Sequence, residues 1–189
     1  MALLNKQDLK SRANDKFGLN AKSRSVVALL ESTKNFSYTK EYDIFLSHSY
    51  LDADEVEILK EDLENTGFSV YVDWIEDAQL NRNNVSPYTA TVIRNRMKNC
   101  KSLIYAFSEN SVLSKWAPWE LGYFDGFNGK VAVLPIFDKP QIGEDYSGVE
   151  FIGIYPYITK AITSFFVQEN SQTWVGYSGW LSGAKPVKH

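Results

Sequence analysis

Trp116 and Glu120 stand four residues apart in a segment rich in aromatic side chains. If this segment is helical, the two side chains share one face of the helix. The helix dipole would favour the ionised form of Glu120, whereas nearby Trp119 and Tyr123 would exclude water and oppose ionisation. A carboxylate beside aromatic faces suits a ligand that combines flat rings with a carbon that becomes positive. The alternative is that the tryptophans belong to the core and that Glu120 only begins a helix.

Two other polar segments are candidates for ligand binding because each follows an apolar run. Ser47 and His48 follow the run 42–46, and a stretch without periodicity, residues 73–86, follows the run 68–72. In an open parallel sheet, ligands bind beyond the carboxyl ends of the strands, and long loops in compact domains are often functional. His48 either contacts a ligand there or satisfies backbone groups in its own turn.

The elements that would position these residues alternate in type from residue 42 onward. Short apolar runs alternate with segments of helical period, which predicts a parallel sheet flanked by helices and hence an α/β fold. The apolar runs predict strands at 42–46, 68–72, 102–107, 131–137 and 151–155. We expect helices from the Asp52 cap to Gly67, from Ser86 to Lys98, from the turn marked by Pro118 to Phe127, and over the closing segment with Ile158, Ile162, Phe165 and Phe166.

The two ends of the chain differ in composition from the segment between them. Residues 1–40 form a polar leader whose amphipathic piece, Ser25–Lys34, predicts an N-terminal helical extension. This helix either docks on the main domain, residues 41–168, or offers a surface for self-association or a partner. For the tail, residues 169–189, a lid, a docking strand and a flexible end stay open as alternatives.

Composition excludes several classes of protein. The 189 residues, 44% of them hydrophobic, fit one domain. With 20 Lys and Arg against 23 Asp and Glu, the chain has no basic excess, so nucleic acid is not expected as a partner. A single cysteine, Cys100, excludes an internal disulfide and suits a reducing, cytoplasmic location. No run approaches the roughly 18 apolar residues of a membrane span, so no membrane partner is expected.

The motifs of other α/β chemistries are missing. Neither G-x-G-x-x-G after the first strand nor G-x-x-x-x-G-K-[ST] occurs, and no G-x-S-x-G elbow accompanies a histidine. A phosphoryl receiver needs a carboxylate after its third strand, where this chain has Ala106-Phe107-Ser108. Because His48 and His189 are the only histidines, a metal site is not expected either. We therefore expect neither a metal nor a cofactor.

Three motifs occur in a fixed order: DIFLSH at 43–48, VYVD at 70–73 and S-x-x-S-x-W-x-x-x-E-L at 111–121. Together they resemble the Toll/interleukin-1 receptor (TIR) domain family, most closely the stand-alone bacterial TIR proteins of Thoeris-type anti-phage defence. The resemblance covers about residues 41–168. It implies a flavodoxin-like sheet of five parallel strands and, in many members, cleavage of NAD+ at the nicotinamide–ribose bond, so that NAD+ is a substrate.

The resemblance also implies roles for individual residues. The catalytic carboxylate falls on Glu120, the turn after the first strand borders the ribose and phosphates, and the segment 73–86 matches a loop that gates the site and mediates assembly. One position departs from the family pattern, because the usual Gly-Asp pair of this loop reads Arg82-Asn83-Asn84. The family's small residue after the tryptophan, often Cys, is Ala117. The implied substrate-binding residues are Ser47, His48, Asp73, Trp74, Arg82 and Trp116.

The chemistry of NAD+ cleavage fits these residue types. Loss of neutral nicotinamide needs no general acid, but the ribose carbon becomes oxocarbenium-like and needs a nearby negative charge, which Glu120 would provide. A tryptophan stacked on adenine, Trp116 or Trp74, would fold the dinucleotide so that an adenine nitrogen or ribose hydroxyl closes a ring in place of water. This reading requires the carboxylate to face an open cleft.

The leading hypothesis is an NAD+ nucleosidase or cyclase that makes ADP-ribose or a cyclic ADP-ribose isomer as an immune signal for a separate effector protein. The second is a non-catalytic module that acts by TIR-to-TIR self-association. The third is an N-glycosidase acting on another nucleotide, which would need the same carboxylate.

Overall fold

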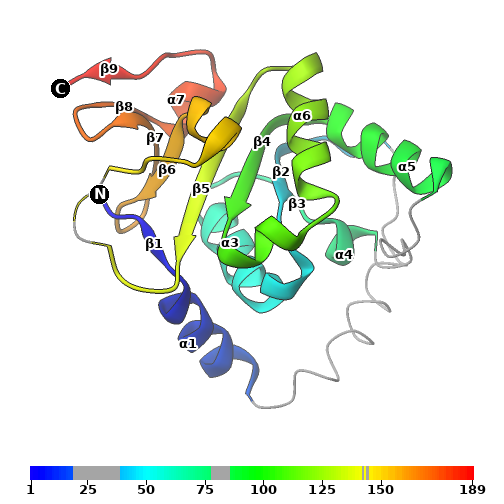
Figure 1. Ribbon diagram of the computed structural model, residues 1–189, viewed down its shortest axis with the longest axis horizontal. Coiled ribbons are helices and arrows are strands. Elements are labelled where there is room, and N and C mark those ends of the chain that lie inside the picture. Colours follow the sequence, from blue (N-terminus) through cyan, green and yellow to red (C-terminus); the bar gives the residue numbers. More distant parts are fainter. Residues whose placement is uncertain (19–38, 78–85, 142, 144) are drawn as a thin grey trace.

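A mostly parallel sheet forms the centre of the computed structural model, which describes residues 1–18, 39–77, 86–141, 143 and 145–189. Five strands run parallel in the order β3, β2, β4, β5, β6 (Figure 1). The predicted α/β architecture is therefore confirmed. The strands are β2 (Tyr42–Ser47), β3 (Val70–Tyr71), β4 (Cys100–Phe107), β5 (Val131–Phe137) and β6 (Tyr157–Lys160).

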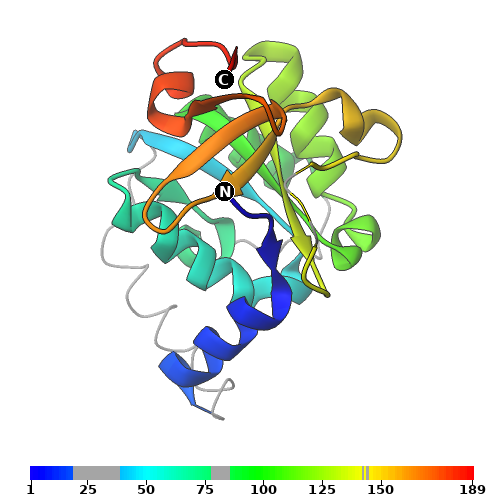
Figure 2. The same cartoon turned by 90° about the vertical axis from the view of Figure 1, so that its left-hand side faces the viewer.

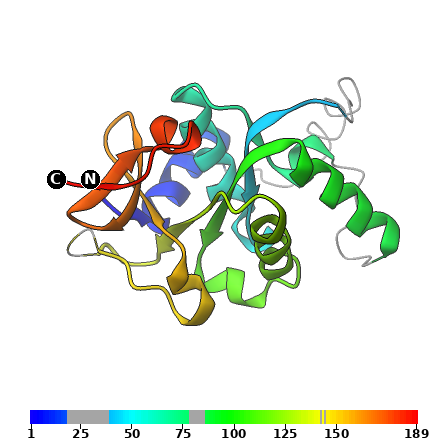
Figure 3. The ribbon, with the colours of Figure 1, turned by 90° about the horizontal axis from the view of Figure 1, so that it is seen from above.

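Helices cover both faces of this sheet, as the view from above shows (Figure 3). One face carries α1 (Lys6–Phe17), α3 (Ala53–Asn65) and α7 (Tyr177–Leu181), and the other carries α5 (Pro87–Lys98) and α6 (Ala117–Phe127). Strand side chains alternate between the two cores, so Ile44 packs with α3 whereas Phe45 packs with α5 and α6. We call these the α3-side core and the α6-side core.

The region after β5 departs from the expected pattern. Residues 151–155, expected as a strand, lie almost entirely in a short 3₁₀ helix, Glu150–Ile154. The expected closing helix over 158–166 is also wrong, because this segment forms β6, a turn and the start of β7 (Phe165–Asn170). Its apolar residues have helical spacing, yet Ile162 lies in the hairpin turn, 95% exposed. The spacing therefore arose from two buried strand ends and one exposed turn residue.

The C-terminal segment continues the sheet. β7, β8 (Thr173–Gly176) and β9 (Val187–Lys188) add antiparallel strands beyond β6. Of the alternatives left open for the tail, the structure supports docked strands. Trp180 of α7 packs into the α3-side core, which anchors this segment.

The N-terminal segment is also part of the sheet. β1 (Leu4–Asn5) pairs parallel with the carboxyl end of β5, and α1 follows it directly (Figure 2). Asn5 begins the helix by accepting backbone N–H bonds through its side chain. The helix expected at 25–34 lies outside the described residues. None of the helices in the described ranges is long and apolar enough to cross a membrane.

A buried carboxylate, Asp52, ties α1 to the carboxyl edge of the sheet. Lys6, the first residue of α1, places its ammonium 2.7 Å from Asp52 Oδ1, and both side chains are buried. Ser108 and Asn110, which follow β4, donate hydrogen bonds to the same carboxylate. Burial opposes the charge on Lys6, but the hydrogen bond and negative charge of Asp52 outweigh it, and the pKa of Lys6 is raised.

Replacing Lys6 by methionine should destabilise the fold strongly, because it leaves the Asp52 carboxylate buried without its cation. We expect the free energy of unfolding in urea to fall by about 3–5 kcal/mol. Lys16→Met is the matched control on the same helix, since Lys16 and its partner Glu61 form an ion pair whose two side chains are 43% and 44% exposed. The control should lose less than about 1 kcal/mol. Equal losses in the two variants would contradict the importance of the Lys6–Asp52 pair.

Candidate active site

The polar segments identified from the sequence meet at the carboxyl edge of the sheet. Ser47 ends β2, Asp73 follows β3, and Ser108 follows β4, and these three parallel strands are neighbours. Ser47 is also the register partner of Tyr105 on β4. In the described part of the chain, these three strand ends therefore lie side by side at one edge of the sheet.

Glu120 lies in the first turn of α6 and faces inward. Its backbone N–H donates to the Trp116 carbonyl at 2.8 Å, so the two residues span one helical turn as expected. Ser47 Oγ donates to Glu120 Oε2 at 2.6 Å, which joins α6 to the end of β2.

The expectation of an open cleft at Glu120 is wrong, because the residue is 0% exposed. The reason lies in the helix face: Ala117, Leu121 and Phe124 form the buried stripe of α6, and Glu120 occupies the same stripe. A carboxylate in this position needs hydrogen-bond donors to offset its lost hydration, and Ser47 provides one.

His48 and Asp73 form a second buried polar pair beside Ser47. His48 Nδ1 lies 3.0 Å from the Leu46 carbonyl, and since a carbonyl only accepts, this nitrogen carries the proton. His48 Nε2 lies 3.8 Å from Asp73 Oδ1. Asp73 begins a short helix, α4 (Asp73–Glu76), where the sequence predicted an irregular loop. His48 therefore bonds a backbone group of its own turn, and its contact with a ligand stays a prediction.

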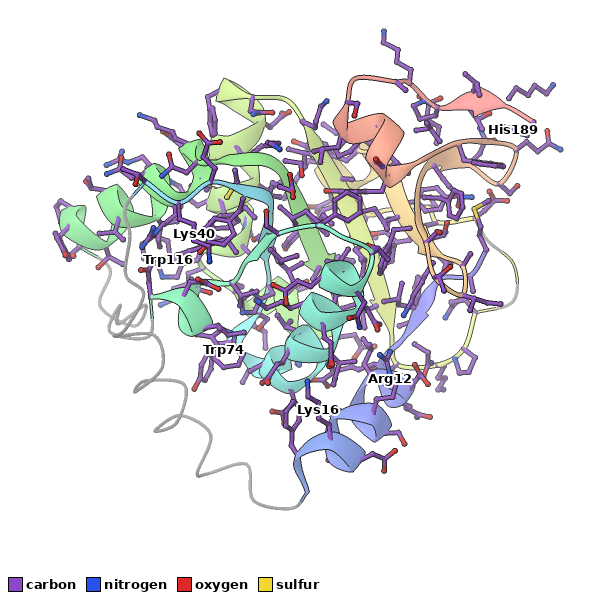
Figure 4. All side chains as sticks on the ribbon, turned by 180° about the vertical axis from the view of Figure 1, so that it is seen from behind. Arg12, Lys16, Lys40, Trp74, Trp116 and His189 are labelled. Atoms are coloured by element: carbon purple, nitrogen blue, oxygen red, sulfur yellow. The ribbon has the colours of Figure 1, made fainter. Side chains whose placement is uncertain are left out.

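The two candidate tryptophans lie at the same end of the molecule but in different cores (Figure 4). Trp116 belongs to the α6-side core and packs edge-on against Trp119, with 5.4 Å between ring centroids. Trp74, on α4, packs against the α3-side core and is half-buried. Its buried indole N–H has no hydrogen-bond acceptor among the described residues, so a ligand oxygen could accept from it.

Arg82, the remaining predicted site residue, lies outside the described residues, as do its neighbours 78–85. Within the described ranges, no three His, Cys, Asp or Glu side chains are grouped as a metal site would require.

Sequence reasoning did not identify Tyr105 as a neighbour of Glu120. Burial raises the pKa of Tyr105, a hydrogen bond with Ser111 opposes this rise, and the negative charge of Glu120 adds to it. The hydroxyl therefore stays protonated beside the carboxylate. A tyrosine within the mostly apolar run at 102–107 was the available signal, but only the strand register reveals its position opposite Ser47.

The TIR domain family profile matches residues 44–158, which include α3 to α6, β3 to β5, most of β2 and the strand-end residues described above. The chain belongs to the TIR domain family. The TIR protein is 47% identical over 159 residues to the "Probable 3' cyclic ADP-D-ribose synthase ThsB'" of Bacillus cereus (strain MSX-D12), covering 81% of this chain and 82% of that relative.

A second relative is more distant and much longer than the matching part. The TIR protein is 34% identical over 92 residues to the "Putative cyclic ADP-D-ribose synthase TIR2" of Cytobacillus dafuensis. This match covers 48% of the chain but only 24% of the relative.

Removing the Ser47 hydroxyl should destabilise the TIR protein because the Glu120 carboxylate would lose a donor in a place without water. We expect Ser47→Ala to lower the free energy of unfolding by about 1–3 kcal/mol, measured by urea titration. Ser147→Ala, at an exposed serine in the loop after β5, is the control and should be neutral. If Ser47→Ala were equally neutral, the bond between β2 and α6 would contribute nothing to folding.

Proposed function

We propose that this TIR protein is a cyclic ADP-D-ribose synthase that cleaves NAD+ at the nicotinamide–ribose bond. The observation that carries this proposal is the similarity to the Bacillus cereus synthase, which extends over most of both chains. A match over 81% of the chain necessarily includes the segment from Ser47 to Glu120. The buried carboxylate at the carboxyl edge of the sheet gives this activity a chemical basis.

In the proposed reaction, the bond between the ribose C1′ and the pyridinium nitrogen breaks, and its electron pair leaves with neutral nicotinamide. C1′ becomes positive, and the carboxylate of Glu120 stabilises this charge. At about 4 Å and an effective dielectric constant near 20, such a pair interacts by roughly 4 kcal/mol. If this attraction is realised only in the transition state, it accelerates the reaction about a thousandfold.

Ring closure follows when a nucleophile within the same molecule reaches C1′ before water. A hydroxyl of the adenosine ribose attacks C1′, a C–O bond forms, and the hydroxyl proton is released. Folding of the dinucleotide makes this step intramolecular, and correct orientation of the two reacting atoms favours it strongly. We assign the binding of the folded substrate to Ser47, His48, Asp73, Trp74, Arg82 and Trp116.

The burial of Glu120 sets a condition on this mechanism. Since the residue is 0% exposed, the ribose reaches the carboxylate only when side chains around the first turn of α6 move. Trp116 lies in this turn and is itself nearly buried, so its displacement would open the path and bring its ring beside the substrate.

Three wider features belong to the proposal. The cyclic product serves as an anti-phage signal that a separate effector protein reads, and NAD+ itself is the substrate partner. We place the reaction in the cytoplasm, where thiols such as that of Cys100 stay reduced. The domain limits 41–168, with an N-terminal extension and a C-terminal tail, remain our proposal for the organisation of the chain.

Self-association is supported by exposed apolar side chains at the carboxyl edge. Tyr50 and Leu51 follow β2, Val112 and Leu113 follow β4, and all four are between 63% and 74% exposed. The hydrogen bond from Asn110 to Asp52 joins the two turns, so the segments that carry these side chains are neighbours. Apolar clusters of this kind mark protein interfaces, and we propose a second copy of the chain as the occupant.

Glu120→Gln should reduce NAD+ cleavage about a thousandfold, because the amide keeps a hydrogen-bond acceptor for Ser47 but carries no charge. Purified protein is incubated with NAD+, and nicotinamide, ADP-ribose and cyclic products are separated by mass spectrometry and NMR. Glu109→Gln, at an exposed glutamate after β4, is the control and should retain activity. Failure of the unmodified protein to release nicotinamide, or equal rates in Glu120→Gln, would contradict the proposed activity.

The double variant Leu51→Asp and Leu113→Asp should weaken self-association, because each copy of the chain would then present negative charges to the other at the proposed contact. Sedimentation velocity at several protein concentrations measures the effect as a shift towards the monomer. Ile162→Asp changes an equally exposed apolar residue in the β6–β7 turn and should leave the distribution unchanged. Identical distributions in all three proteins would reject the surface formed by residues 50, 51, 112 and 113.

A further inference from the structure

A fully satisfied polar triad lies beneath the short helix α4. Arg96 of α5 donates two hydrogen bonds to Asp77, from Nε to Oδ2 and from Nη2 to Oδ1, both at 2.7 Å. Tyr71 of β3 donates its hydroxyl to Asp77 Oδ2, also at 2.7 Å. All three residues are buried, and Asp77 is 0% exposed. We call Tyr71, Asp77 and Arg96 the α4 clamp.

The α4 clamp fixes the end of the element that carries two proposed substrate-binding residues. Asp77 follows α4 immediately, and its backbone N–H donates to the Asp73 carbonyl at 2.7 Å, closing the helical turn. Trp74 lies within this turn, and Asp73 begins it, facing His48. A change in the backbone position of Asp77 would therefore also displace Asp73 and Trp74.

The chemistry of the clamp specifies orientation as well as position. A guanidinium that donates two parallel bonds to one carboxylate holds it in a single plane, which a lysine could not do. Burial and the charges of Asp77 and Asp73 raise the pKa of Tyr71, so its hydroxyl remains a donor. The Arg96 guanidinium also lies over the Tyr71 ring, 5.7 Å from its centroid.

Stability alone is a poor explanation for such a cluster. Removing the hydration of two charges is costly, and apolar residues of similar volume often give equal or greater stability than a buried ion pair. Paired hydrogen bonds have a preferred direction, which apolar contacts lack, and here they restrain the segment that carries Asp73 and Trp74. A displacement of about 1 Å in a segment that positions the substrate is enough to lower the reaction rate about a hundredfold.

We propose that Arg96, through Asp77 and Tyr71, is a positioning residue that sets the share of cyclic product by orienting Asp73 and Trp74 against the bound dinucleotide. This inference rests on the proposed function. Ring closure needs the adenosine half to be held over C1′, whereas capture by water needs no such order. Loosening of α4 therefore lowers the cyclic share and weakens substrate binding, while the charge of Glu120 still supports bond cleavage.

The test replaces the whole clamp by apolar residues in the full-length protein. The triple variant Arg96→Met, Asp77→Leu, Tyr71→Phe leaves no buried charge or hydroxyl of the clamp unpaired, so its melting temperature should stay near that of the unmodified protein. Rates are measured over a range of NAD+ concentrations, and ADP-ribose and cyclic products are quantified by mass spectrometry. We expect KM to rise about tenfold, kcat to change less, and the ratio of cyclic product to ADP-ribose to fall severalfold.

Two further variants separate positioning from folding. Arg96→Lys keeps the charge but loses the paired bonds, and should lower the cyclic share by a smaller factor than the triple variant. Arg94→Met, on the same helix, removes a guanidinium that contacts Thr91 of its own turn, and should leave KM and product ratio unchanged.

The outcomes for the two proposals can be told apart. If the unmodified protein does not consume NAD+, the proposed function fails, and this inference fails with it. If the unmodified protein is active but the folded triple variant has the same KM and product ratio, only the role of the α4 clamp is overturned. A triple variant that unfolds would show that the clamp is needed for stability, and Arg96→Lys with unchanged product ratio would then also overturn the inference.

Discussion

The buried carboxylate of Glu120 is the constraint on which the geometry of the site depends. It is enclosed at the first turn of α6, and the hydroxyl of Ser47 at the end of β2 donates to it. A carboxylate without donors in the interior would cost several kcal/mol, so the helix and the strand must keep the register that joins them. Tyr105 of β4 is the register partner of Ser47, so β4 is aligned with the strand end that bonds Glu120.

A second buried carboxylate, Asp52, links the site to a segment that precedes the residues matched by the family profile. Asp52 receives bonds from the segment after β4, and its cation is Lys6, which precedes the matched residues 44–158. β1 occupies the carboxyl end of the β5 edge, while β6 pairs with β5 at Val133, nearer the start of the strand. The N-terminal segment is therefore a structural part of the edge where the candidate site lies, and its removal would expose both a strand and a carboxylate.

The sequence was sufficient for those elements in which local pattern and packing agree. β2 and β5 are apolar runs between turn signals, and α3 ends before Gly67, whose φ of +94° suits glycine. It was insufficient where one pattern fits two structures, as in 158–166, whose apolar spacing suits a helix but belongs to a hairpin. Contacts between distant residues, such as Arg96 with Asp77, have no local signal. The spacing of Glu120 with the apolar residues of α6 indicated that it is buried. The requirement for an accessible catalytic carboxylate led to the opposite expectation.

Enclosure of Glu120 bears on catalysis as well as on folding. The attraction between a carboxylate and a developing positive charge is weak in water and grows as water is excluded. A carboxylate held open to solvent would stabilise the ribose cation little, and water would also capture that cation before a ring could close. A site that opens to admit NAD+ and closes again around Trp116 and Glu120 would combine strong charge stabilisation with protection from hydrolysis. Under the proposed function, the burial of Glu120 and ring closure in place of hydrolysis would both depend on the same exclusion of water.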